Sequence, residues 1–149
     1  MAKRLDVVYC LICLLTSFSV FLWVNIERSG VSSGGYNNEF TVQPPAKGGK
    51  AECLLTWYGS SKMRRDSDIT QLILGAGVDD ADSLPVLLFV RIVGENYVSC
   101  GRVTCVHCDE IREHGAGTVL KFTLRLSQFD QGLADQSAFR NILKESTKS

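Results

Sequence analysis

The stretch from Pro85 to Leu126 constrains the fold of this chain more than any other part of its sequence. Residues 86–93 are nearly all apolar, a pattern typical of a strand that is covered on both faces. Residues 118–126 alternate between apolar and polar side chains, as in a strand with one buried face. The stretch therefore predicts a sheet of strands that follow one another along the chain.

The residues between these two strands predict a hairpin. Residues 94–96 read Gly-Glu-Asn, which favours a short turn. Residues 97–106 would form the returning strand, and Gly101 in its middle indicates a bulge or a close backbone approach. Residues 109–117 are polar and predict a loop.

Three further elements are expected around this hairpin. Residues 51–58 predict a strand, and a short helix would begin after Ser67 and end at Gly75. A closing helix is expected between Ala138 and Glu145. The predicted fold class is α+β, with a small, mainly antiparallel sheet and one or two short helices.

An apolar segment precedes this domain. Residues 7–24 carry no charge and would extend about 27 Å as a helix, close to the thickness of a bilayer core. The pattern predicts a single transmembrane helix, with a cleaved signal peptide and a buried core helix as alternatives. Lys3 and Arg4 before the segment outnumber Arg28 after it, which favours a lumenal or extracellular position for the folded domain.

Four regions follow from this interpretation. Residues 1–28 would form a cytosolic tip and a membrane anchor, which makes the lipid bilayer a partner. Residues 29–50 are rich in Gly, Ser, Pro and Asn and predict a flexible linker. Residues 51–145 would form the α+β domain, and residues 146–149 a disordered tail.

The charges give little support to nucleic-acid binding. The chain has 16 Lys/Arg and 16 Asp/Glu, so it carries no net formal charge. A nucleic-acid-binding domain usually shows a basic excess or stripe. No sequence motif for a catalytic serine, a zinc protease or a phosphate-binding loop is present. A non-enzymatic role is the prediction, with another protein as partner.

The cysteines offer the main chemical alternative. Cys105 and Cys108 form a C-x-x-C pair, and together with His114 they are the candidate metal ligands, with zinc as the candidate cofactor. Cys53 could supply a fourth ligand. A redox dithiol, a disulfide and buried free thiols remain open for the same residues.

Part of the central stretch resembles an uncharacterised β-rich domain found at the C-terminal end of some bacterial helicase-type proteins. The resemblance covers residues 86–126 and is carried by three runs, Leu-Leu-Phe-Val-Arg at 87–91, Tyr-Val-Ser-Cys-Gly-Arg-Val at 97–103 and Phe-Thr-Leu-Arg-Leu at 122–126. Leu124 stands where the pattern has Trp. The resemblance implies a compact sheet domain that recognises a ligand, such as a nucleic-acid feature.

The sequence therefore predicts a membrane-tethered, non-enzymatic binding or assembly module. The alternatives are a thiol- or zinc-dependent domain that uses Cys105 and Cys108, and a nucleic-acid-recognition domain.

Overall fold

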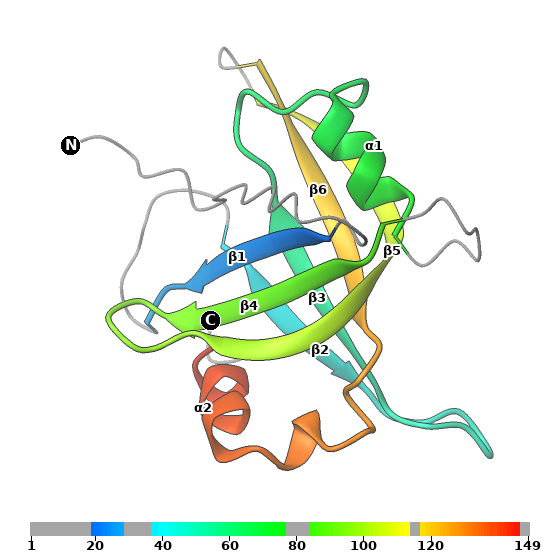
Figure 1. Ribbon diagram of the computed structural model, residues 1–149, viewed down its shortest axis with the longest axis vertical. Helices are drawn as coiled ribbons and strands as arrows, with labels where there is room; N and C mark the ends of the chain where they lie inside the picture. The colour runs from blue at the N-terminus through cyan, green and yellow to red at the C-terminus, as the bar shows by residue number, and fades with distance from the viewer. Residues whose placement is uncertain (1–18, 29–36, 77–83, 114–116, 147–149) are drawn as a thin grey trace.

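The strands and helices described below come from a computed structural model (Figure 1), which describes residues 19–28, 37–76, 84–113 and 117–146. Within these ranges the chain forms six strands, one 3₁₀ turn and two α-helices. The elements in chain order are β1 (Val20–Ile26), β2 (Glu39–Gln43), β3 (Glu52–Tyr58), α1 (Asp68–Leu74), β4 (Val86–Ile92), β5 (Val98–Glu113), β6 (Gly117–Leu126), η1 (Leu133–Asp135) and α2 (Ser137–Ser146).

All six strands belong to one mixed sheet, in the order β1-β4-β5-β6-β3-β2. β1 pairs with β4 in parallel, and the other four pairs are antiparallel. The predicted fold class, a mainly antiparallel sheet behind a transmembrane helix, is wrong in two respects. The sheet is mixed, and its parallel strand comes from the segment that was predicted to span a membrane.

The physical reason lies in the composition of β1. The strand reads Val-Phe-Leu-Trp-Val-Asn-Ile, and its residues alternate between buried and half-buried positions. Branched and aromatic side chains of this kind favour a pleated surface as much as a lipid-facing helix. Six of the seven residues are apolar, and a nearly continuous apolar run is typical of a strand paired in parallel.

This finding corrects the predicted localisation as well. No helix in the described parts of the chain is long and apolar enough to cross a membrane. The transmembrane helix and the single-pass membrane localisation are therefore contradicted. Residues 7–18 of the predicted span lie outside the described residues. In the segment predicted as a linker, β2 forms one edge of the sheet.

The core lies on the inner face of this sheet, under α2. Phe139 of α2 is fully buried and makes edge contacts with Phe40 at 5.5 Å and Phe129 at 6.3 Å, measured between ring centroids. The backbone N–H of Phe40 donates to the Ser146 hydroxyl at 2.6 Å, which fixes the end of α2 to β2. The closing helix predicted between Ala138 and Glu145 is confirmed, and it extends by one residue at each end.

Asn38 connects the two halves of the curved sheet. Its side-chain amide donates to the carbonyl oxygen of Asn25 at the end of β1, at 3.2 Å. Its side-chain oxygen accepts from the N–H of Tyr58 on β3, at 3.1 Å. The C-terminal end of β1 is thereby held near β3, although β1 and β3 are not neighbours in the sheet.

The hairpin of β5 and β6 is longer than the sequence predicted. Residues 109–113, expected as a loop, continue β5 and pair with β6 up to Gly117. Asp109 and Lys121 face each other there, as do Arg112 and Thr118. This part of the hairpin has few buried residues, so apolar alternation could not signal it.

Gly101 allows β5 to bulge, as predicted. The register between β4 and β5 shifts between Leu88 and Phe89, opposite this part of β5. Gly101 has φ of 75°, in the left-handed region, and a Cβ atom at this position would overlap the side chain of Gln128.

Gly101→Ala is expected to lower the free energy of unfolding by about 1–2 kcal/mol from the positive φ alone, and by more because of the overlap with Gln128. Gly94→Ala is the matched control, because Gly94 has φ of 91° but nothing within 4 Å of its added Cβ. Urea unfolding of both variants measures the difference. Equal losses would show that Gln128 moves aside without cost.

Candidate functional site

The outer face of β1 and β4 carries a cluster of aromatic side chains. Trp23 and Phe89 lie opposite each other in the parallel register, and their rings stack at 4.4 Å with an angle of 18° between planes. Phe21 contacts Phe89 at 5.8 Å, and Tyr97 contacts Trp23 edge-on at 4.8 Å. All four residues are half-buried. We call Phe21, Trp23, Phe89 and Tyr97 the aromatic face.

The aromatic face ends in a small polar network. The Oδ1 atom of Asn25 accepts from Arg91 Nε at 2.7 Å and from the Tyr97 hydroxyl at 3.2 Å. The Arg91 guanidinium also lies over the Tyr97 ring, 4.6 Å from its centroid, as in a cation–π contact. These contacts fix the orientation of Tyr97 and place a positive charge beside the rings.

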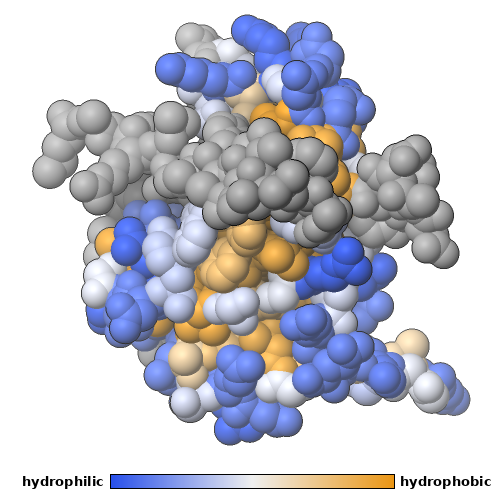
Figure 2. Space-filling model, viewed as in Figure 1, coloured by the Kyte–Doolittle hydropathy of each residue, from blue (hydrophilic) through white to orange (hydrophobic). Residues whose placement is uncertain are grey.

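A groove adjoins the aromatic face at Tyr97. It has a volume of about 320 Å³ and lies between the turn that follows β4 and one side of α2. The residues that line it are Glu95, Asn96, Tyr97, Val98, Ala138, Asn141 and Ile142. Figure 2 is drawn in the same view as Figure 1. It shows hydrophobic surface near the middle of the face toward the viewer, with hydrophilic residues around it.

This face was not predicted from the sequence, because Phe21 and Trp23 were assigned to a membrane helix. A signal was available in the same residues. The apolar run from Val20 to Ile26 has the length of a strand and is enriched in branched and aromatic side chains. Its pairing with β4, and therefore the contact of Trp23 with Phe89, depends on residues 66 positions away and has no local signal.

The second candidate site is the cysteine pair on β5. A bulge at Val106 shifts the register, so Cys105 lies opposite Leu124 and Cys108 lies opposite Phe122. Leu124 and Phe122 are two residues apart on β6 and share its buried face, so both cysteines share that face too. In a regular strand, residues three apart would point to opposite faces. The bulge therefore brings the C-x-x-C thiols to one side of the sheet.

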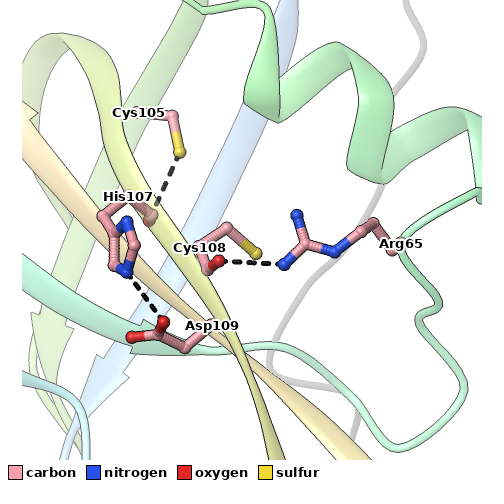
Figure 3. Close-up of polar contacts among 5 residues, drawn as sticks. All are labelled: Arg65, Cys105, His107, Cys108 and Asp109. Carbon is pink, nitrogen blue, oxygen red and sulfur yellow. Dashed lines mark hydrogen bonds and ion pairs between the residues drawn. The ribbon is translucent and has the colours of Figure 1, made fainter.

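The polar contacts of this pair are shown in Figure 3. The Cys105 thiol donates to the carbonyl oxygen of His107 at 3.6 Å, and Arg65 donates to the carbonyl oxygen of Cys108 at 2.9 Å. The His107 ring lies 2.7 Å from an Asp109 carboxylate oxygen, with both side chains more than half exposed. His107 pairs with Thr123, so its ring is on the other face of the sheet from the two thiols.

The four cysteines of the folded part are free thiols. Burial raises the pKa of Cys105 to about 11, and the neighbouring Cys108 adds to this increase. Burial also raises the pKa of Cys108, although the Arg65 charge opposes the increase. The pKa values of Cys53 and Cys100 rise to about 12, again because of burial. A reactive thiol needs the opposite shift, toward thiolate at neutral pH.

The structure describes two of the three predicted metal ligands and leaves the third untested. Cys105 and Cys108 share one face, but His114 lies outside the described residues. Cys53 is on β3 and buried, and its neighbour is Cys100, whose pKa it helps to raise. Among the residues that the structure describes, no group of three His, Cys, Asp or Glu side chains could hold a metal ion. The zinc site stays a prediction.

An open hollow of about 420 Å³ lies near the cysteine pair. Its lining is polar and carries charges of both signs, from Arg64, Arg65, Asp66, Gln71 and Glu110. Arg65 connects it to β5 through the bond to Cys108. The mixed charges select no particular ligand.

Neither a protein-family model nor a curated protein or solved structure matches this chain. The resemblance to the helicase-associated domain therefore stays an expectation.

Cys105 is expected to react slowly with iodoacetamide in the folded protein. At pH 8 a pKa of about 11 leaves a thiolate fraction roughly a hundredfold smaller than an ordinary pKa of 9.0 does. The rate should rise with pH and reach half of its maximum near pH 11, which alkylation followed by peptide mass spectrometry measures. The same chain unfolded in guanidinium is the control, and a folded-state profile with its midpoint at about pH 9 would contradict the shift.

Proposed function

We propose that the protein is a non-enzymatic binding or assembly module and that the aromatic face is its contact surface. One observation carries the proposal. β1 and β4 are paired in parallel, and such strands are usually covered on both faces. Their inner face is covered by α2 and the core. Their outer face carries Phe21, Trp23 and Phe89, and no described helix packs on it.

The composition of the face supports a protein partner. Trp, Tyr and Arg are the residues most enriched at positions that dominate the binding energy of protein interfaces. Here Tyr97 contacts both Trp23 and Arg91, and the Asn25 side chain holds Tyr97 and Arg91 in place. A surface ordered before binding loses less side-chain entropy when a partner docks.

The two alternatives have less support. Thiol chemistry at Cys105 and Cys108 would require lowered pKa values, and burial raises both. A nucleic-acid platform offers ring faces to the bases. One face of Trp23 and one face of Phe89 are turned toward each other at 4.4 Å, so neither of these two faces can stack on a base.

Site-specific photocross-linking in cells tests the proposal. p-Benzoylphenylalanine in place of Phe89 is expected to give a discrete protein adduct. The same group in place of Val106, which is 46% exposed on β5, is the matched control and should give none. Trp23→Ala is expected to reduce the Phe89 adduct strongly, since loss of a central interface residue costs 2 kcal/mol or more, about a 30-fold change in affinity. Adducts of equal yield at both positions, or none at either, would refute the proposal.

A further inference from the structure

β1 is an edge strand whose hydrogen-bonding groups can be assigned residue by residue. The N–H of Val20 donates to Pro85 at 2.9 Å, and the carbonyl oxygen of Ile26 accepts from Val93 at 3.0 Å. In a parallel pair, a residue that bonds to its neighbour does so with both its N–H and its C=O, and such residues alternate. Residues 20, 22, 24 and 26 therefore bond to β4. The backbone groups of Phe21, Trp23 and Asn25 point to the free edge.

Two of these three residues have no partner at that edge among the described residues. The carbonyl oxygen of Asn25 accepts from the Asn38 side chain at 3.2 Å. The N–H and C=O groups of Phe21 and Trp23 point away from β4, and the described sheet has no strand on that side of β1. Each such group prefers a hydrogen-bonding partner, and a row of them is a template for another strand.

The opposite edge of the sheet shows how this chain protects an edge. β2 has five residues, begins with Glu39 and exposes four of its side chains. The N–H of Phe40 is bonded to the Ser146 hydroxyl. β1 shares only the last of these features, at Asn25, whose carbonyl oxygen is bonded to the Asn38 side chain. It has seven residues, no charge, no proline and no glycine. An edge that is long, apolar and unprotected is expected to pair with another strand.

We propose that this edge takes β1 of a second copy of the chain, antiparallel and about a twofold axis near Leu22. This proposal rests on the function proposed above and names the partner. In this register Phe21 lies opposite Trp23 of the partner subunit, and the two exchange both of their N–H···O bonds. The twofold axis repeats the exchange between Trp23 of this copy and Phe21 of the partner subunit, so four hydrogen bonds form in total. Asn25 takes no part and keeps its bond to Asn38.

Three features favour a second copy as the occupant. A twofold axis places the same backbone groups on both strands. Residues 21 and 23 of one copy can then bond to residues 23 and 21 of the other copy without a bulge in either strand. The strand is uncharged, so a second β1 brings no charge that would need a partner. Side chains of paired residues lie on the same face of a sheet, so Phe21 would contact Trp23 of the partner subunit and join the two aromatic faces.

Amide hydrogen exchange of the unmodified full chain tests the pairing without any substitution. At concentrations where the dimer forms, the amides of Phe21 and Trp23 are expected to exchange slowly, and on dilution they should become fast. Leu22 is the internal control, since its amide bonds to β4 and should stay slow at every concentration. Fast exchange of Phe21 and Trp23 at all concentrations would overturn the proposal. Slow exchange that does not depend on concentration would also overturn it, because the chain itself would then cover the edge.

Sedimentation velocity of the full chain gives the second readout. We expect a reversible dimer that Phe21→Lys weakens by at least about tenfold, because an edge lysine opposes strand pairing. Val42→Lys, on the β2 edge and 43% exposed, is the matched control and should leave the dimer unchanged. A monomer at all concentrations, or a dimer that Val42→Lys weakens as much, overturns the pairing.

The cross-linking experiment separates this proposal from the proposed function. A Phe89 adduct between two copies of the chain supports both. An adduct with a different protein overturns the second-copy partner and leaves the binding function standing. The absence of any adduct overturns both.

Discussion

The parallel pairing of β1 with β4 is the interaction on which the rest of the structure depends. It runs without a break from Val20 opposite Val86 to Ile26 opposite Ile92. The inner side chains of β1 are almost completely buried, with Leu22, Val24 and Ile26 at 1% exposure or less. Without this strand, β4 would become the edge and one side of the core would be open. The end of a segment that resembled an anchor outside the domain, from Val20 onward, is thus a structural part of it.

The same pairing forms the aromatic face, which is the surface that we propose for binding. A parallel pair is apolar on both faces, and α2 covers only the inner one here. The stack of Trp23 on Phe89 follows directly from the register, because the two residues are opposite each other. Among the described residues, the backbone groups of Phe21 and Trp23 have no partner at the outer edge of β1, because β1 lies at the end of the sheet. The face and the edge are together the basis for proposing that a partner binds at β1.

The fold brings the two cysteines of the C-x-x-C motif to one face of the sheet, but it does not lower the pKa of either thiol. The bulge at Val106 turns Cys105 and Cys108 to one face, as a metal site or a dithiol would need. Packing against the core then raises the pKa of both thiols by burial, and Arg65 offsets only part of the increase at Cys108. The bulge brings the thiols together, and burial of the same face lowers their thiolate fraction.

Local patterns in the sequence were sufficient for several elements. The β3 strand, the helix between Ser67 and Gly75, the hairpin with its bulge at Gly101, and α2 all have signals within a few residues. The polar end of the β5–β6 hairpin was missed, because strands without a buried side show no apolar alternation. Of the candidate site, only the cysteine pair was predicted. Trp23 and Phe89 lie in two separate apolar runs, and no local pattern in the sequence shows that these runs pair with each other.

The sequence by itself determined which segments are apolar, where turns and helix ends fall, and that a sheet forms between Pro85 and Leu126. It also determined that the segment ending at Val24 must be removed from water. Only the tertiary structure decided how. An apolar run can be removed from water either by lipid around a helix or by pairing as a strand in a sheet, and the second outcome requires a neighbouring strand that offers its backbone groups. β4 offers these groups to β1, although the paired residues of the two strands are 66 positions apart in the sequence.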